Sequence, residues 1–466
     1  MAGSHSLLLT QVPDLIGLAG AYPRQFPFLL DNAAIAQSGG HSLLLFSRGE
    51  VLERQASGEV FGPGTGAGFL ERLENWYESE KSEVDPALDP AGLEIPFIGG
   101  WFIYLGYEMA AEIEDCLNLP RSQYDLPDAL ACRCPGAVII RHPEDSSAKT
   151  APYAFLVAES RDVLLEMHDL LNREIVAKSD LAPELTRLQA EDPVRFNSAV
   201  LKILRYLRDG DVFQVNISRH WTGEFACAPD VMDLYRCLRL HNPAPFAGLM
   251  RWGDQAVLSS SPERLVELRG RRVQTRPIAG TRPRSADPDR DLALSRELID
   301  NVKERAEHIM LIDLERNDLG RVCRPGTVEV SELMVIESYA HVHHIVSNVR
   351  GELTPEATPV DTLRAVFPGG TITGCPKVRC MEIISELEQV GRGFYTGSMG
   401  YLGINGNMDL NILIRSMLLH GRNISFRTGA GIVADSEPDL ELQETQDKAR
   451  GLLLALESEC QEIGVA

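Results

Sequence analysis

Basic residues are scarce in this sequence, which has 45 Lys and Arg against 67 Asp and Glu and a formal net charge of −22. Because an acidic field repels phosphate backbones, we expect no nucleic-acid partner. No apolar run approaches the roughly 18 residues that span a bilayer. The N-terminal residues MAGSHSLLLTQVPDL have no basic segment followed by a long apolar one. We therefore expect no membrane segment and no secretory signal.

A disulfide framework is also missing. The nine cysteines are odd in number and scattered from Cys116 to Cys460, which favours reduced thiols in a cytoplasmic protein. The pair Cys132 and Cys134 has the wrong spacing for a zinc knuckle. What the chain does have is 44% hydrophobic residues over 466 positions. That content is enough to bury a sizeable core.

The pattern along the chain mixes strands with helices. Short apolar runs between Gly and Pro turns predict strands over the first 140 residues. Apolar residues three and four apart predict helices at 159–189, 193–211 and 294–316. We place a boundary near 185–190, between an N-terminal region (1–185) and a catalytic region (190–460). We expect the two regions to pack as one integrated unit.

Two pairs of glutamates are spaced for one face of a helix. Glu304 and Glu307 are three residues apart, as are Glu441 and Glu444, and Lys448 follows one turn later. A single such pair is most often a solvated acidic face. Two pairs that face each other across a pocket would suit Mg²⁺, which prefers oxygen ligands and keeps waters free for a substrate carboxylate.

Three further motifs are candidates for a binding site. The turns FPGGTITGCPK (367–377) and TGAGIVADS (428–436) offer free backbone amides of the kind that bind carboxylate or phosphate. SSSPE (259–263) places Glu263 after a turn-favouring Ser-Pro, where an acid can point into a cleft. The histidines of HVHH (341–344) lack a third ligand at zinc spacing, so structural or substrate-contacting roles are favoured.

Ten sequence blocks in order resemble the chorismate-utilising enzymes, the family of anthranilate synthase component I, aminodeoxychorismate synthase component I, isochorismate synthase and salicylate synthase. They span about half of the chain and read DVFQVNISR, SSPERLVEL, PIAGTRPR, ERAEHIMLIDLERNDLGRV, HVHHIVS, FPGGTITGCPKVRCMEII, YTGSMGYLG, LNILIRS, GAGIVADS and ETQDKAR. The resemblance implies an α/β (α+β) fold with two packed β-sheets and outer helices, as in anthranilate synthase component I.

The resemblance also implies roles for the candidate residues. Glu304, Glu307, Glu441 and Glu444 would surround a Mg²⁺ that grips the ring carboxylate of chorismate, which helps the C4 hydroxyl to depart. Glu263 would be the general acid that protonates this hydroxyl, so its pKa should be raised. The other substrate-binding positions that the family pattern implies are Tyr395 and Arg415 for the enolpyruvyl carboxylate, Gly429 and Gly431, Lys448, His344 and Thr371.

The nucleophile follows from position 214. Family members that add water carry a Lys there as general base, and this chain has Gln214. A neutral amide cannot take a proton from water, whereas ammonia needs no such base. We therefore expect ammonia as the nucleophile.

Two ammonia-using activities remain open, with nitrogen added at C4 (aminodeoxychorismate) or at C2 (anthranilate). FPGGTITG, HHIVS, GSMGY and FIGGWFIYLGYE resemble the aminodeoxychorismate synthases, which serve p-aminobenzoate and folate synthesis. However, many of these enzymes have a nucleophilic Lys where this chain has Ala279. We favour aminodeoxychorismate synthase component I, with anthranilate synthase component I as the alternative.

The supply of ammonia points to a partner. The chain has no glutaminase pattern around a nucleophilic Cys, so we expect a separate glutamine amidotransferase subunit. A catalytically silent subunit that scaffolds such a glutaminase is a further alternative. The family's tryptophan site corresponds here to FLLDNA (28–33), with Asp31 and Asn32 in place of Glu-Ser, and to NPAPF (242–246).

Overall fold

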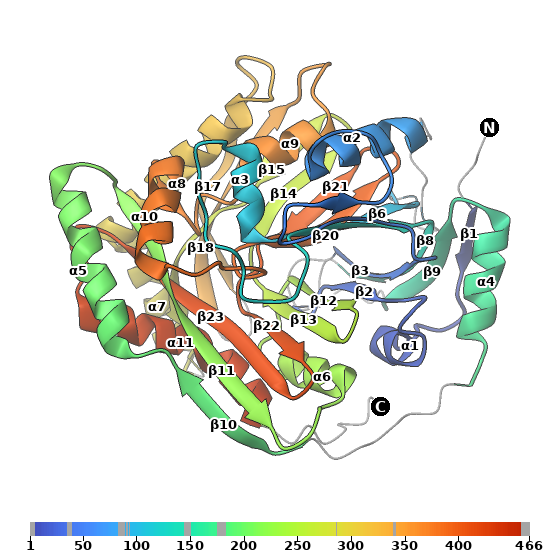
Figure 1. The fold of residues 1–466 in the computed structure, drawn as a ribbon, viewed down its shortest axis with the longest axis horizontal. Helices are drawn as coiled ribbons and strands as arrows, with labels where there is room; N and C mark the ends of the chain where they lie inside the picture. Colours follow the sequence, from blue (N-terminus) through green and yellow to red (C-terminus); the bar gives the residue numbers. More distant parts are fainter. Residues whose placement is uncertain are drawn as a thin grey trace.

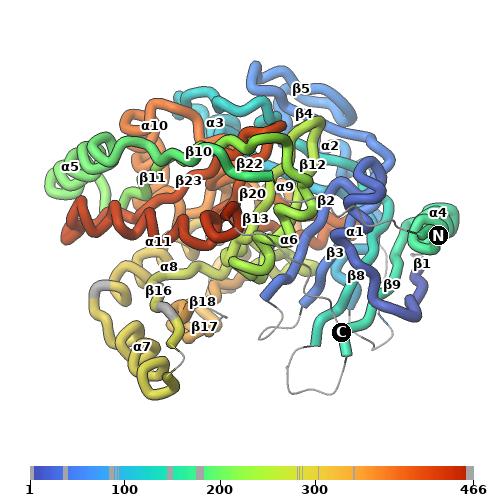
Figure 2. Tube along the Cα trace, turned by 90° about the horizontal axis from the view of Figure 1, so that it is seen from below, coloured from blue at the N-terminus to red at the C-terminus, as the bar shows by residue number. Residues whose placement is uncertain are grey.

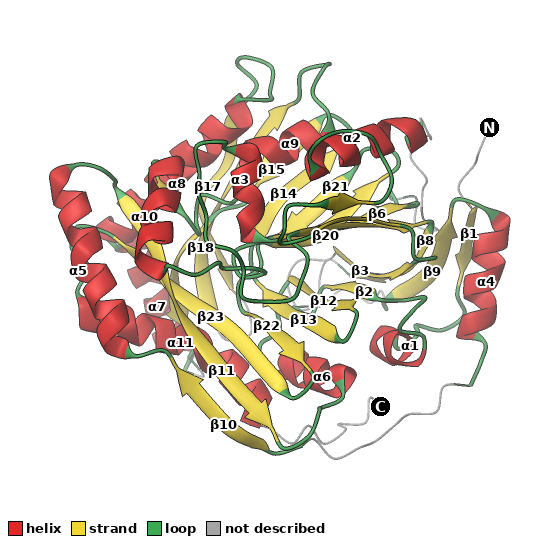
Figure 3. Cartoon of the chain, in the orientation of Figure 1, coloured by secondary structure: helices red, strands yellow, loops and turns green. Residues whose placement is uncertain are grey.

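The computed structural model describes residues 5–34, 40–82, 89, 92, 94–143, 151–174, 183–285, 287–338 and 342–457. Two large antiparallel sheets pack against each other, and the helices lie around the outside of the pair (Figures 1 and 3). The predicted fold class, an α/β protein with two packed sheets and outer helices, is confirmed.

The first sheet has 12 strands in the described part of the chain. Strands from both sides of residues 185–190 pair directly in it, since Ala247 lies opposite Asp31. Its order is β1 (His5–Leu8), β9 (Tyr153–Ala158), β8 (Gly136–His142), β3 (Gly40–Phe46), β2 (Phe28–Asp31), β12 (Phe246–Trp252), β13 (Gln255–Ser261), β22 (Ser416–His420), β23 (Asn423–Ile432), β11 (Gln214–Phe225) and β10 (Leu185–Ala190), with β19 (Gly374–Cys375) against β11.

The second sheet has 11 strands over the same described ranges. It also mixes early and late segments, because residues 100–105 pair with residues 398–403. Its order is β16 (Ile278–Pro283), β18 (Val342–Glu352), β15 (Arg272–Thr275), β14 (Arg264–Arg269), β21 (Met408–Asn411), β20 (Ser398–Gly403), β6 (Gly100–Leu105), β7 (Ala129–Cys134), β4 (Val51–Arg54) and β5 (Val60–Phe61), with β17 (Glu329–Ser338) against β18.

The helices lie on the outer surfaces of the two sheets, and α7 projects from the body beside β16 and β17 (Figure 2). Most begin with a side chain that caps a free N–H, as Asp192 and Asn301 do. The helices are α1 (Leu15–Ala21), α2 (Phe69–Glu80), the 3₁₀ turn η1 (Tyr107–Met109), α3 (Ala110–Ile113), α4 (Arg161–Leu171), α5 (Pro193–Asp209), α6 (Val231–His241), α7 (Pro288–Asp300), α8 (Val302–Gly320), α9 (Pro359–Val366), α10 (Lys377–Glu388) and α11 (Pro438–Glu457).

Alternation along β11 divides its side chains between two environments. Val215 and Ile217 pack with Ala430 and Ile432 of β23 against α5 and α10. Because successive strand residues point to opposite faces, Gln214 and its alternate neighbours point to the other face. The first residues of β11 therefore place apolar side chains on its outer face and polar side chains on its inner face.

The predicted helices are partly correct. The helix at 193–211 is confirmed as α5, which ends at Gly210 in a left-handed conformation (φ 82°). The helix at 294–316 is two helices, because the chain breaks at Asn301. The single helix over 159–189 is wrong at its end: α4 stops at Leu171, and residues 185–190 form strand β10, paired with β11.

Within the described ranges no helix is both long and apolar enough to cross a membrane. The expectation that all cysteines are reduced is wrong for Cys237 on α6, which is disulfide-bonded. The cysteines in thiol form are Cys116, Cys132, Cys134, Cys227, Cys323, Cys375 and Cys380.

Candidate active site

Glu263 lies in the turn between β13 and β14, and its side chain is buried with 5% exposed. The Ile412 N–H donates to its carbonyl oxygen at 3.0 Å, which fixes the turn against β21. Burial raises the pKa of Glu263 to about 7, and the Thr371 hydroxyl, the Ile278 N–H and Lys448 act in the opposite direction. A carboxyl with this pKa holds a proton over a large fraction of time at neutral pH.

Ala279 lies next to Ile278, whose N–H faces Glu263. It is the second residue of β16, pairs with Ile345 of β18 and is 9% exposed. Ala279 is therefore one residue away from a backbone group that contacts Glu263. The methyl group of Ala279 has no atom that could act as a nucleophile.

Gly280 links β16 to two of the predicted site residues. Its φ is +71°, and a Cβ there would lie 2.3 Å from Oε2 of Glu304, so only glycine fits. Its carbonyl accepts a hydrogen bond from the His344 ring of β18. Burial lowers the pKa of His344 to about 4, and nearby Arg415 acts in the same direction. His344 is therefore neutral at pH 7.

The first glutamate pair lies on α8. Oε1 of Glu304 forms an ion pair with Nη1 of Arg282 at 2.7 Å. Its other oxygen, Oε2, is buried and has no hydrogen-bond partner among the described residues. Glu307 follows one turn later on the same helix.

The second glutamate pair lies on α11, as predicted from its spacing. Glu441 is buried, with 8% exposed, whereas Glu444 is exposed and pairs with Nζ of Lys448 at 2.6 Å. The same Nζ donates to the carbonyl oxygen of Gly429 at 3.0 Å. Lys448 therefore connects α11 to the C-terminal half of β23. Residues 428–432, expected to form a turn, belong to this strand, and Gly429 lies opposite Ser218 of β11.

No group of three or more His, Cys, Asp or Glu side chains in the described residues is close enough to hold a metal ion. Arg282 and Lys448 instead neutralise one glutamate of each pair. The chemistry of the donors still fits Mg²⁺, because all are carboxylates and one buried oxygen of Glu304 lacks a partner. The magnesium site stays a prediction.

Arg415 and Tyr395 lie on segments that meet at Gly429. Arg415 has a φ of +51°, unusual for a residue with a side chain, and its Nη1 donates to the Lys448 carbonyl oxygen at 2.8 Å. A Cβ at Gly429 would lie 2.7 Å from Oη of Tyr395. Burial raises the pKa of Tyr395 to about 12, against the pull of Arg392. Its phenol is therefore a neutral donor at pH 7.

Gln214 begins β11, where Cys375 of β19 lies opposite it. Its side chain is 7% exposed and extends across β23, since a Cβ at Gly431 would lie 2.3 Å from its Nε2. At Gly429 a side chain would also meet the Ile217 carbonyl oxygen at 2.8 Å, whereas at Gly431 it would displace the end of the Gln214 side chain. The structure brings the predicted residues Glu263, Thr371, Ala279, His344, Tyr395, Arg415, Gln214, Gly429, Gly431 and Lys448 to one region between the sheet edges.

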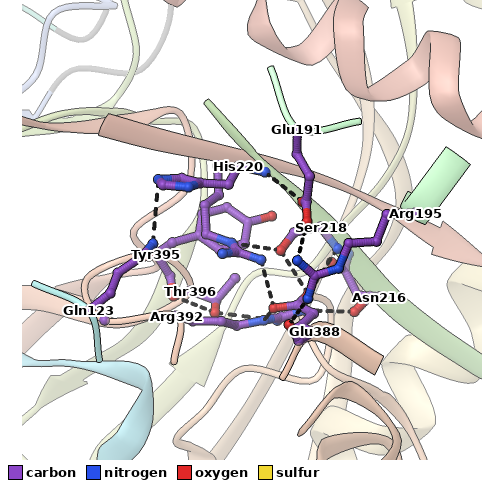
Figure 4. A network of polar contacts seen from close by, with 12 residues as sticks. Gln123, Glu191, Arg195, Asn216, Ser218, His220, Glu388, Arg392, Tyr395 and Thr396 are labelled. Atoms are coloured by element: carbon purple, nitrogen blue, oxygen red, sulfur yellow. Dashed lines mark hydrogen bonds and ion pairs between the residues drawn. The ribbon is translucent and has the colours of Figure 1, made fainter. Parts of the chain in front are cut away.

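A buried ion network behind Tyr395 was missed by sequence reasoning (Figure 4). Glu388, at the end of α10, accepts from Arg392 at 2.7 Å and from Arg427 at 3.0 Å. It also accepts from the Ser218 hydroxyl at 2.8 Å. The Arg392 guanidinium lies 5.6 Å from the Tyr395 ring centroid, so the network contacts the ring of a predicted site residue. Nothing in the local sequence distinguishes these charges from surface ones.

Two further polar groups were also missed. Glu315 on α8 is buried, and burial raises its pKa to about 8, with Asp318 acting in the same direction and Lys377 opposing. Asn216 lies two residues after Gln214 on β11 and is 9% exposed. The strand period could have identified Asn216, because it shares a face with Gln214.

The two segments matched to the family's tryptophan site do come together. Asp31, Asn32 and Phe246 line a cavity of about 730 Å³. The Asp31 carboxylate there accepts from Ser42 at 2.8 Å and forms an ion pair with Arg239 at 2.8 Å. Whether this cavity binds tryptophan stays a prediction.

Comparisons with known proteins identify a family for the chain. Residues 45–454 match the family described as chorismate binding enzyme. The chain is 45% identical to the anthranilate synthase component I-like protein of Synechocystis over 78% of this chain and 74% of that one. It is 41% identical to aminodeoxychorismate synthase component 1 of Bacillus subtilis over 83% and 82%. The crystal structure of anthranilate synthase component I from Streptococcus pneumoniae has a TM-score of 0.71 at 29% identity and covers 97% of this chain and 94% of that one.

Proposed function

Because the chain belongs to the family of chorismate-binding enzymes, we propose that it is aminodeoxychorismate synthase component I. The reaction is the Mg²⁺-dependent amination of chorismate by ammonia to 4-amino-4-deoxychorismate, the precursor of p-aminobenzoate in folate synthesis. In this reaction a C–N bond forms, the C4–O bond breaks, and the C4 hydroxyl leaves as water.

The observation that carries the proposal is the presence of a buried acid, Glu263, together with Gln214 at the position of the family's lysine. Glu263 is a buried carboxyl with a pKa near 7, so it can protonate a leaving hydroxyl. Gln214 stands where a water-adding enzyme needs a Lys. A site with an acid and without a base for water suits a nucleophile that needs no deprotonation, and ammonia is one.

The remaining residues bind and orient chorismate in this proposal. Arg415 and the Tyr395 phenol hold the enolpyruvyl carboxylate, the first as a cation and the second as a neutral donor. Neutral His344 and Thr371 line the ring. Glu304, Glu307, Glu441 and Glu444 would hold Mg²⁺, which would supply positive charge to neutralise the ring carboxylate and withdraw electron density from the diene.

The preference for C4 rests on four sequence blocks. FPGGTITG, HHIVS, GSMGY and FIGGWFIYLGYE resemble aminodeoxychorismate synthases more than anthranilate synthases. Ala279 follows Ile278, whose N–H faces Glu263, but it lacks a nucleophilic atom, so in this proposal ammonia reaches C4 without a covalent enzyme intermediate at this position. Ala279→Lys tests the point, since an unchanged product and an intact rate would show that position 279 does not set the site of amination.

Anthranilate synthase component I is the second candidate, and Ala279 is the observation that favours it. Relatives at similar identity carry both names. The product would then be anthranilate, formed with release of pyruvate.

Ammonia at neutral pH is mostly ammonium, so we also propose a glutamine amidotransferase partner. The names of the two relatives designate them as component I and component 1, which implies a second component for those proteins. The purified chain alone should form no aminated product from chorismate and glutamine. The chain purified together with a candidate glutaminase should form it.

Product analysis tests the proposed function. The purified chain is incubated with chorismate, Mg²⁺ and ammonium at alkaline pH, and the products are separated and weighed by mass spectrometry. Aminodeoxychorismate retains the enolpyruvyl group and yields p-aminobenzoate when a lyase is added. Fluorescent anthranilate with free pyruvate would instead establish the second candidate.

A catalytically silent scaffold is the alternative outside enzymology. Glu263 and all four predicted metal ligands are present, which argues against it. Glu307→Ala and Glu444→Ala should each abolish turnover, whereas Asp447→Ala, an exposed position on α11, should not. Full activity in both glutamate variants would show that Glu307 and Glu444 are not metal ligands needed for turnover.

A further inference from the structure

Two buried amide oxygens on the inner face of β11 lack hydrogen-bond partners. They are Oε1 of Gln214 and Oδ1 of Asn216, and neither has a partner among the described residues. The two side chains are 7% and 9% exposed. Buried polar atoms are normally paired, and leaving one unpaired is costly, so an acceptor of this kind calls for a ligand with a hydrogen to donate.

The strand geometry places the two amides side by side. Gln214 and Asn216 are alternate residues and so share a face. Across the pair of strands, Asn216 lies opposite Gly431. A Cβ at Gly431 would be 2.3 Å from Nε2 of Gln214, and a Cβ at Gly429 would be 2.8 Å from Oδ1 of Asn216. Both amides therefore lie over Gly429 and Gly431, which present no side chain to that face, while the Ala430 side chain packs on the other face.

Asn216 also lies next to the predicted substrate anchor. The Cβ position at Gly429 is 2.7 Å from Oη of Tyr395 and 2.8 Å from Oδ1 of Asn216, so these two oxygens converge on one glycine. Figure 4 shows Asn216, Arg392 and Tyr395 in one cluster. A small molecule held at Asn216 would thus be beside chorismate.

We propose that the side-chain oxygens of Gln214 and Asn216 accept N–H groups of ammonia and hold it for attack on the substrate. The inference rests on the proposed function, because it specifies where the nucleophile of that reaction binds. Ammonia donates two of its hydrogens to the amides, and its lone pair stays free to form the new C–N bond.

The charges around the amides favour neutral ammonia over ammonium. Nη2 of Arg392 donates to the backbone carbonyl oxygen of Asn216 at 2.9 Å, so a guanidinium is adjacent. The nearest carboxylate in the network, Glu388, is already paired with Arg392 and Arg427. A second cation would meet repulsion here, whereas the nucleophilic form, which is uncharged, does not.

The chemistry of chorismate argues against the substrate as the group that pairs with these amides. Its two carboxylates only accept hydrogen bonds, as amide oxygens do. Its C4 hydroxyl, which Glu263 protonates in the proposed reaction, has a single hydrogen and so cannot pair with both amide oxygens. Ammonia is the reactant whose N–H groups can donate hydrogen bonds to both amide oxygens.

The test is steady-state kinetics of Asn216→Ala and Gln214→Ala with ammonia varied at fixed pH and saturating chorismate. The loss of one neutral hydrogen bond should raise the KM for ammonia about tenfold in each. The KM for chorismate should change less than about twofold, and kcat at saturating ammonia should be retained. Asn423→Ala, an exposed asparagine of β23, is the matched control.

A second variant protects the test against loss of folding. Asn216→Asp keeps an acceptor oxygen in the same place, so its KM for ammonia should remain within about threefold of the wild-type value. Thermal unfolding of each variant is compared with that of Asn423→Ala.

A raised KM for chorismate with an unchanged KM for ammonia would overturn the inference, because it would show that the two amides bind chorismate. Unchanged KM values for both would also overturn it. If the wild-type chain forms no aminated product from ammonia, the proposed function fails and this inference with it. If wild-type amination is normal and only the variants disagree, the inference alone is wrong.

Discussion

Glu263 and Glu388 are both buried, with 5% of each exposed, yet they end in opposite states. Burial raises the pKa of Glu263 to about 7. Burial also opposes the charge of Glu388, but Arg392 and Arg427 outweigh it and hold its pKa down to about 2. Desolvation thus prepares an acid only where no cation is placed in contact. One glutamate is available for chemistry, and the other fixes structure.

The largest effect is expected from removal of the acid. Glu263→Gln keeps the shape of the side chain but cannot donate a carboxyl proton, so kcat should fall about 1000-fold. The rate of product formation measures this, with Glu166→Gln, an exposed glutamate on α4, as the control. A loss of less than tenfold would show that Glu263 is not the general acid.

Removal of the paired glutamate should affect stability. Glu388→Gln leaves two arginines buried without their carboxylate, which should lower the free energy of unfolding by about 3–5 kcal/mol. Urea unfolding at pH 7 measures the difference. A variant as stable as the wild type would mean that the Glu388 network does not stabilise the fold.

The two glutamates should also give opposite dependences of stability on pH. The lowered pKa of Glu388 contributes stability that is complete above about 4.5 and is lost as the pH falls toward about 2. The raised pKa of Glu263 contributes stability below about 4.5 that is lost as the pH rises through about 7. Between pH 4.5 and 8, Glu263→Gln should therefore gain on the order of 3 kcal/mol relative to wild type.

The catalytic rate should follow the protonation of the same carboxyl. Because Glu263 must be protonated to donate, kcat should decline about tenfold per pH unit above a pH near 7. Initial rates at saturating chorismate and ammonia across pH 6–9 give this profile. A rate that is constant across that pH range would show that protonation of Glu263 does not control kcat.

The smallest effect concerns Thr371. Its hydroxyl lowers the pKa of Glu263, so Thr371→Val should move the limb of the rate profile to higher pH, by on the order of one pH unit. The same kinetic series measures the shift. Movement to lower pH would contradict the role of the hydroxyl.

The family resemblance predicted the fold with its two packed sheets, and local patterns predicted its helices in part, but neither predicted the charge balance within the fold. The helical spacing of Glu304 with Glu307 and of Glu441 with Glu444 held in α8 and α11. The run ELTRLQA was misread as helix because its leucines have helical spacing, while pairing with β11 makes it a strand. Tertiary pairing overrode the local pattern there.

The buried polar groups show a second limit of sequence reasoning. Arg392 and Glu388 are four residues apart, which is also the spacing of an exposed ion pair. Arg427 of β23 is 35 residues after Arg392 in the sequence, and it contacts Glu388 only because the chain folds back. The same holds for Asn216, whose unpaired oxygen becomes evident only when its surroundings are known.

Infrared difference spectroscopy of the wild type against Glu263→Gln tests the central claim most directly. The carbonyl stretch of a protonated carboxyl should be present at pH 6 and absent in the variant, and it should disappear with a midpoint near pH 7. A band that is already missing at pH 6, with Glu263 ionised through the neutral range, would contradict the account of a buried acid kept protonated by its surroundings.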